Sequence, residues 1–208
     1  PPSGSANFMW IQHFAHHLAP NGHAGFVMPN GALAVSGKEG EMRRKLVEDD
    51  LVDVIISCPG KLFYNVSLPV SLWFLAKNKS GDRFRNRAGE TLFIDARDTF
   101  EQISRKQVVF NPEHIQKIAG TGRAWRGEPG APEYKDILGF SKTVKKGDIE
   151  KAGYVLTPGR YVGLADEIDD GVPFDEKIQK LSMELKDAFK KGDELEKRIS
   201  DNLRKLNV

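Results

Sequence analysis

The sequence predicts a mixed α/β fold: a parallel sheet whose last strand is reversed, followed by a long C-terminal helix. Residues 7–58 alternate between helical and strand-like apolar patterns, in the order helix, strand, helix, strand. Another apolar run, 69–76, follows the strand 51–58 after only ten residues, a gap too short for a helical crossover. The last 35 residues carry apolar side chains at helical spacing.

The first helix is expected at 7–18, where apolar residues such as Phe8 and Ile11 recur at helical spacing. The turn-forming sequence Pro-Asn-Gly at 20–22 ends this helix. A short apolar strand at 23–28 follows, and it leads into a second Pro-Asn-Gly turn. A helix and a strand are therefore the opening elements of the chain.

The second helix is expected at 39–49, with charged residues on its outer face, and the second strand at 51–58. The near-continuous hydrophobicity of that strand indicates burial on both sides of the sheet. The unit 23–58 is a βαβ crossover, which makes the two strands parallel with a right-handed connection. The run 69–76 is expected to return antiparallel, as in a hairpin.

After these elements the periodic signal weakens. A strand is expected at 91–96, on an edge of the sheet, and a short helix at 111–119, opened by Asn-Pro. The stretch 120–134 is rich in Gly and Pro and is expected to be a loop or linker. Residues 154–163 are expected to be strand-like around a Pro-Gly turn.

The terminal helix has a heptad seam in which apolar positions alternate by four and three. Its weak points are Ala188, Gly192, where the helix could break, and Asn202. The seam residues are Phe174, Ile178, Leu181, Leu185, Ala188, Gly192, Leu195, Ile199, Asn202 and Leu206. A helix of this length with no following helix is expected to pair with another protein.

The composition is that of a soluble globular protein: 39% of the 208 residues are hydrophobic, 29% are charged and the net charge is +2. Cys58 is the single cysteine and lies in an apolar run, so we expect a buried strand residue and a reducing, cytoplasmic environment. No stretch approaches the roughly 18 apolar residues of a membrane span, and the first residues lack the features of a secretory signal. The net charge predicts local patches rather than a polycationic surface.

Two apparent site motifs are better explained as ordinary structure. His13 and His17 are four residues apart, but Phe14 occupies the place of the glutamate expected in a zinc helix, so exposed histidines are the preferred interpretation. Gly120-Thr121-Gly122 does not follow a strand and lacks the Gly-Lys-Ser/Thr of a phosphate loop. The sequence therefore predicts no metal ligands.

Two loops are expected at one edge of the sheet, because ligands of open α/β sheets bind beyond the carboxyl ends of parallel strands. One is the loop 28–31, which contains Asn30, and the other is 59–65, which contains Lys61, Phe63, Tyr64 and Asn65. Enzymes that modify a base in duplex DNA extrude it and hold it between aromatic or apolar side chains. The alternative is that Phe63 fills the end of the core.

Three arginines at alternate positions form a second candidate site. Arg83, Arg85 and Arg87 would project to one side of a hairpin-like loop, where they could bind phosphates of DNA. A solvated surface loop explains the same pattern.

Four stretches of the chain resemble the modification subunit of type I restriction–modification systems, an N6-adenine DNA methyltransferase. The order of the stretches is also that of the family. They are ANFMWIQHFAHHLAPNGHAGFVMPNG, IISCPGKLFYNVSLPVSLWFLAKNK, LFIDAR and YVLTPGRYVG.

The resemblance implies that 1–98 is the second half of a Rossmann-like methyltransferase sheet, 99–171 an extension and linker, and 172–208 an assembly helix. The helix would dock on the specificity subunit, which reads the DNA sequence, and contact the restriction subunit indirectly. Phe63, with Tyr64 second, would stack on the extruded adenine.

The family's S-adenosylmethionine loop and Asn-Pro-Pro-Phe motif are missing from this sequence. The resemblance therefore implies a fragment that binds no S-adenosylmethionine alone, has no catalytic residue of its own and is inactive in isolation. The alternative is a free-standing, non-catalytic interaction module derived from a methyltransferase.

Overall fold

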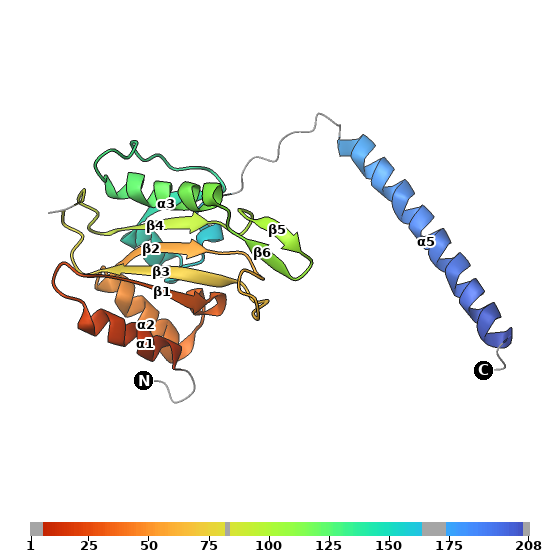
Figure 1. The fold of residues 1–208 in the computed structure, drawn as a ribbon, viewed down its shortest axis with the longest axis horizontal. Helices are drawn as coiled ribbons and strands as arrows, with labels where there is room; N and C mark the ends of the chain where they lie inside the picture. The colour runs from red at the N-terminus through yellow and green to blue at the C-terminus, as the bar shows by residue number, and fades with distance from the viewer. Residues whose placement is uncertain (1–5, 82–83, 164–173, 206–208) are drawn as a thin grey trace. The chain divides into compact units, whose positions relative to one another are not determined.

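A computed structural model describes residues 6–81, 84–163 and 174–205 (Figure 1). The chain divides into two compact units, 1–165 and 166–208, which are described separately. In the described residues, no helix has both the length and the apolar composition needed to cross a lipid bilayer.

The first unit is an α/β domain with a central five-stranded sheet. Its first half contains α1 (Asn7–His17), β1 (His23–Pro29), the 3₁₀ turn η1 (Asn30–Leu33), α2 (Gly37–Glu48), β2 (Val52–Ser57) and β3 (Val70–Ala76). Its second half contains β4 (Glu90–Asp95), β5 (Glu101–Ser104), β6 (Gln107–Val109), α3 (Pro112–Arg126), β7 (Ser141–Lys145), α4 (Lys146–Lys151) and η2 (Pro158–Arg160).

The sheet has the strand order β1-β3-β2-β4-β7. Strand β3 is antiparallel to both β1 and β2, so these two strands run in the same direction with the reversed strand between them. Strand β4 is parallel to β2 and β7 antiparallel to β4. The expected reversed strand is therefore confirmed, and the sheet as a whole is mixed.

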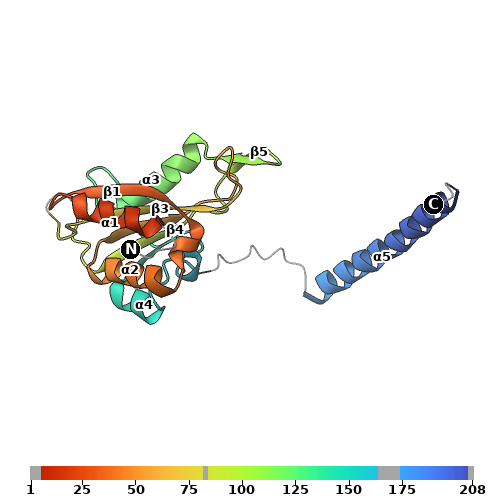
Figure 2. The same cartoon turned by 90° about the horizontal axis from the view of Figure 1, so that it is seen from below.

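Each face of the sheet contributes to a separate apolar core. One core joins α1, α2 and α4 to the sheet through residues such as Phe8, Leu46 and Ile149, with Trp73 at its centre. The other core lies under α3, where Trp125 is fully buried against residues of β2 and β4. Figure 2 shows α1, α2 and α4 on one side of the sheet and α3 on the other.

Three sequence-based expectations require correction. Strand β4 is not at an edge, because β7 pairs with it through Glu90–Ile94. The helix expected at 111–119 continues to Arg126 through the stretch Gly120–Gly122, because burial of Trp125 offsets the roughly 1 kcal/mol cost of each helical glycine. Residues 154–163 contain a 3₁₀ turn and no strand.

The sequence analysis missed the hairpin β5–β6, strand β7 and helix α4. The sequence of β7 is Ser-Lys-Thr-Val-Lys, which is too polar to predict a strand, but an edge strand tolerates such residues. Because β7 pairs with β4, the segment predicted as an extension supplies part of the main sheet.

In its described residues the second unit is one helix, α5 (Phe174–Lys205), which agrees with the predicted long helix. It continues through Gly192, so the suspected break is absent from these residues. Its large apolar side chains are between 46% and 68% exposed: Ile178, Leu181, Met183, Leu185, Phe189, Leu195, Ile199 and Leu203.

Candidate functional site

The carboxyl ends of β1 and β2 lie at one rim of the sheet, as predicted. The backbone N–H of Asn30 donates to the carbonyl of Pro69 (3.3 Å), and that of Cys58 donates to the carbonyl of Val70 (2.9 Å). Both turns therefore contact the first residues of β3, which enters the sheet between them. Figure 1 shows the tips of β1 and β2 at the same end of the sheet.

The end of β4 extends this rim. Ala96 N–H donates to the carbonyl of Ser57 (2.9 Å), and Arg97 binds both carboxylate oxygens of Asp95. Gly159 of η2 packs so closely here that a Cβ would lie 2.7 Å from Arg97 Nη2 and 3.1 Å from Asp95 Oδ2. Segments more than 60 residues apart in the sequence thus meet at one edge.

The loop between β2 and β3 exposes two aromatic rings at this rim. Phe63 and Val66 form an isolated bridge around a tight turn, with Tyr64 at its tip. The side chain of Phe63 is 44% exposed and that of Tyr64 is 84% exposed. Leu62 packs on the core beside the sheet, so Leu62 rather than Phe63 closes the core here.

A glycine allows this loop to fold back on itself. A Cβ on Gly60 would lie 2.8 Å from the carbonyl oxygen of Ser67, on the opposite arm of the loop. The next residue, Lys61, has a φ of 62°, a conformation uncommon for residues with a side chain. The conformation of the aromatic turn therefore depends on the backbone at Gly60 and Lys61 more than on burial of its own rings.

Two polar oxygens at the rim are buried without a hydrogen-bond partner. They are Oδ1 of Asn30, just after β1, and Oγ of Ser57, the last residue of β2. Unpaired buried polar groups are uncommon, but they also occur away from the rim, at Arg87 Nη2 and Trp125 Nε1, so they do not by themselves identify a ligand site. The sequence analysis selected Asn30 and Asn65 but missed Ser57, and Asn65 is exposed.

Lys61 is exposed beside the aromatic turn. Its ammonium group donates to the carbonyl of Arg105 (2.8 Å), and its own carbonyl accepts from Val108 N–H (3.1 Å). These bonds place Lys61 next to Arg105 and Lys106, two basic residues that the sequence analysis did not select.

The predicted arginine cluster has a different environment. Arg83 lies outside the described residues. Arg87 is 1% exposed, and its Nε donates to Asp53 Oδ1 (3.1 Å). Arg85 donates from Nη2 to Glu90 (2.8 Å) and from Nε to the carbonyl of Trp125. The expectation that alternate spacing presents these guanidinium groups to solvent is wrong for Arg87, because the loop folds back over β2.

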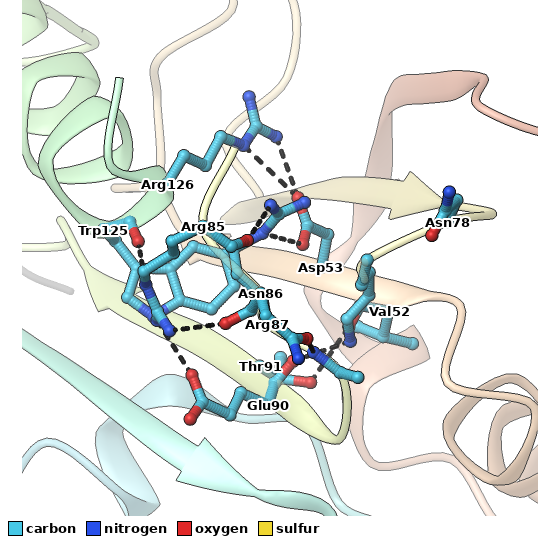
Figure 3. A network of polar contacts seen from close by, with 12 residues as sticks. Val52, Asp53, Asn78, Arg85, Asn86, Arg87, Glu90, Thr91, Trp125 and Arg126 are labelled. Carbon is cyan, nitrogen blue, oxygen red and sulfur yellow. Dashed lines mark hydrogen bonds and ion pairs between the residues drawn. The ribbon is translucent and has the colours of Figure 1, made fainter. Parts of the chain in front are cut away.

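Arg85 and Arg87 belong to a partly buried charge network at the opposite end of β2 from the rim; Figure 3 draws this network. Its members are Asp50, Asp53, Lys79, Arg85, Arg87 and Arg126. Asp53, which is fully buried, also accepts from Arg126 Nη2 (3.1 Å) through its second oxygen. An aspartate within the apolar strand 51–58 was the available sequence signal, because a buried carboxylate requires partners.

Lys79 extends the network at the start of β2 and β4. Its ammonium group is 2.6 Å from Asp50 Oδ1, 3.0 Å from the Val52 carbonyl and 2.7 Å from the Glu90 carbonyl. Burial lowers the pKa of Lys79 more than the neighbouring carboxylate raises it. These contacts give the network a structural role.

Cys58 is buried, and His13 and His17 are exposed, as the sequence predicts. Burial raises the pKa of the Cys58 thiol to about 11, so the thiol is protonated at neutral pH. His17 contacts the backbone carbonyl of His13 (2.9 Å) in its own helix. In the described part of the chain, no group of three or more His, Cys, Asp or Glu side chains is arranged to hold a metal ion.

Comparison with known proteins identifies the family of the chain. Residues 1–170 match the N-6 DNA methylase family. The chain belongs to this family. It is 50% identical over 98% of its length to the MjaIX methylase subunit, a type I restriction enzyme subunit of Methanocaldococcus jannaschii, and 35% of that relative is covered.

Solved structures of type I methylase subunits share the fold. The methyltransferase subunit of a type I restriction–modification system from Streptococcus thermophilus superposes with a TM-score of 0.66 at 28% identity, covering 77% of this chain and 31% of that one. A structure describing complex assembly of a type I system gives a TM-score of 0.60 at 19% identity, over 96% of this chain and 40% of that one. The chain spans about a third of the length of the MjaIX methylase subunit and of the Streptococcus thermophilus subunit.

The family uses S-adenosylmethionine. At the rim, Arg97 pairs with both oxygens of Asp95, the acidic residue at the end of β4. The sequence contains no Asn-Pro-Pro motif.

Proposed function

We propose that this chain is part of a type I adenine-N6 DNA methyltransferase subunit, in which it forms one wall of the target-base pocket. The described domain corresponds to the second half of the methyltransferase sheet, with β3 as its reversed strand. The observation that carries the proposal is the exposed Phe63-Tyr64 turn, held at the rim where β1, β2 and β4 end.

Phe63 is the proposed stacking residue, with Tyr64 beside it. Phe63 stays 44% exposed and lies outside the apolar core, whereas the neighbouring Leu62 packs against that core. Stacking on an extruded base gives such a ring a function, because every base offers an apolar face. The unpaired oxygen of Asn30 is a proposed hydrogen-bond acceptor for the edge of the base. The exposed amide of Asn65 is a proposed donor or acceptor for the same edge.

Replacement of Phe63 in the complete subunit, assembled with its specificity subunit, tests this role. Phe63→Ala is expected to reduce kcat/KM for methylation about 5- to 150-fold, the equivalent of about 1–3 kcal/mol of lost stacking. A mismatch opposite the target adenine lowers the cost of extrusion and should restore part of the rate.

Leu68→Ala is the matched control, because Leu68 is an apolar residue of the same loop and is 67% exposed. Phe63→Tyr keeps the ring and should retain most of the activity. If Phe63→Ala and Leu68→Ala methylate DNA equally well, Phe63 is not part of the base pocket.

The proposed partner of α5 is the specificity subunit, and the restriction subunit would be contacted only indirectly. The helix carries its large apolar side chains at 46–68% exposure, which is the pattern of a helix that completes a bundle with another chain. The related structure that describes complex assembly of a type I system is consistent with this assignment.

Substitutions on α5 test the docking. Leu185→Ser with Leu195→Ser is expected to abolish co-purification with the specificity subunit, while the domain 1–165 stays folded by circular dichroism. Asp187→Ser with Lys197→Ser is the control, because each lies about 200° around the helix from Leu185 or Leu195. Equal recovery of the partner with both double variants would contradict the docking proposal.

The alternative is a non-catalytic interaction module that uses α5 alone. We assign S-adenosylmethionine and the catalytic motif to segments of the family that this sequence does not contain. The chain by itself is therefore expected to show no methyl transfer to duplex DNA, and turnover by the purified chain would contradict this assignment. If the complete subunit also fails to bind or methylate DNA, the module becomes the better explanation.

A further inference from the structure

The hairpin β5–β6 projects from the same end of the sheet as the aromatic turn (Figure 1). It is a separate two-stranded sheet with Ser104 opposite Gln107, so Arg105 and Lys106 form its turn. All four residues of β5 are exposed. Such a short ribbon has little stability of its own and depends on neighbouring contacts.

Those contacts come from Lys61 of the aromatic loop. Its ammonium group binds the carbonyl of Arg105 (2.8 Å), and its carbonyl accepts from Val108 N–H in β6 (3.1 Å). The hairpin turn is thus fixed beside the Phe63-Tyr64 turn, and three cationic residues gather in one exposed patch.

The charge of this patch is not balanced within the described part of the chain. Arg105 and Lys106 are exposed, and neither forms an ion pair there. The acidic residue of the hairpin, Glu101, pairs in register with Val109 at the end remote from the turn. Adjacent cations without counter-charges form a favourable site for an anionic ligand.

We propose that β5–β6 is a DNA-contacting arm, in which Arg105 and Lys106, together with Lys61, bind phosphates of the strand that carries the extruded base. This inference rests on the proposed function, because the arm is placed beside the proposed base pocket. Phosphate contacts of this kind position the duplex but read no sequence. The arm therefore holds the backbone next to the target nucleotide while Phe63 holds the base.

Salt dependence of DNA binding by the complete subunit assembled with its specificity subunit tests the arm. The probe is a random-sequence duplex, titrated between about 50 and 200 mM KCl. Arg105→Ala with Lys106→Ala is expected to reduce the slope of log affinity against log salt by about 2, because each lost phosphate contact removes about one counterion. Arg105→Lys with Lys106→Arg should keep the slope of the unmodified protein.

Lys142→Ala with Lys145→Ala is the charge-matched control, because both lysines are exposed on β7, a strand of the main sheet that does not pair with the hairpin. The arm proposal is overturned if the hairpin variant keeps the original slope, or if it loses no more than this control. It is also overturned if the hairpin variant binds DNA normally but loses a protein subunit, since the arm would then be a protein interface.

The same experiment separates failure of the arm from failure of the proposed function. If the unmodified complex methylates DNA and Phe63→Ala is impaired, an unaffected hairpin variant contradicts the arm alone. If the unmodified complex does not bind the duplex, the proposed function fails and the arm fails with it.

Discussion

The two ends of strand β2 differ in which groups they bury and which they expose. At its start, Asp53 and Arg87 are almost fully buried, and each has a charged partner within 3.1 Å. At its end, Phe63 and Tyr64 expose apolar rings, and the oxygen of Asn30 has no partner. The first end pairs its charged groups with one another, although Arg87 Nη2 has no hydrogen-bond partner, whereas the proposed function assigns the exposed groups of the second end to a ligand. Under the proposed function, stability and ligand binding are therefore assigned to opposite ends of one strand.

This difference predicts that mutations at the two ends affect different measurements. At the buried end, substitutions should reduce the free energy of unfolding. At the rim, substitutions should leave it nearly unchanged and act on DNA binding or methylation.

The largest effect on stability is expected for Asp53→Ala. Loss of this carboxylate leaves Arg87 buried and unpaired, and breaking such a pair costs about 3–5 kcal/mol. Urea denaturation of the full chain measures the change. The double variant Asp53→Leu with Arg87→Met removes both charges and should recover much of the loss. A change below about 1 kcal/mol for Asp53→Ala would show that the network contributes little.

A smaller effect is expected for Lys79→Met. This change removes the donor for the carbonyls of Val52 and Glu90, and an unsatisfied buried acceptor costs about 1–3 kcal/mol. The expected loss of unfolding free energy is smaller than that for Asp53→Ala, because Asp50, the charged partner of Lys79, is 31% exposed and can be solvated. Thermal unfolding of the same chain gives the comparison, and a larger loss for Lys79→Met would reverse the proposed ranking.

The smallest effect on stability is expected at the rim. Phe63→Ala and Tyr64→Ala should each change the free energy of unfolding by about 0.5 kcal/mol or less, since both rings are already exposed in the folded chain. Urea midpoints measured beside those of Asp53→Ala provide the check. A loss of several kcal/mol from Phe63→Ala would identify it as a core residue and remove the contrast between the two ends.

The sequence was sufficient for the elements with strong apolar periodicity. Strands β1, β2 and β3, helices α1 and α2, and the shared rim follow from hydrophobic pattern and strand direction. The sequence was insufficient where tertiary contacts overrode local preference: α3 continues through Gly120 and Gly122 because Trp125 is buried at its end. Strand β7 was missed because an edge position does not require an apolar sequence.

The candidate site, like the fold, could be predicted from the sequence only in part. The aromatic loop was predicted because two bulky rings stood beside turn residues. Arg87 was expected to face solvent, because alternate spacing does not show which way a loop folds. Asp53 in an apolar strand indicated a buried carboxylate, and such a carboxylate requires a buried cation as its partner. The unpaired oxygen of Ser57 and the basic turn of β5–β6 become apparent only when distant segments are brought together.

The insertion of β3 between β1 and β2 has a consequence for synthesis of the chain. In the described residues, all seven residues of β1 pair with β3 from Val70 to Ala76. A nascent chain that has emerged only through β2 therefore lacks the middle strand, and side-by-side pairing of β1 with β2 at that stage would be non-native. The domain is expected to acquire its sheet only after residue 76 has left the ribosome, which makes a late, cooperative folding step an inherent property of this strand order.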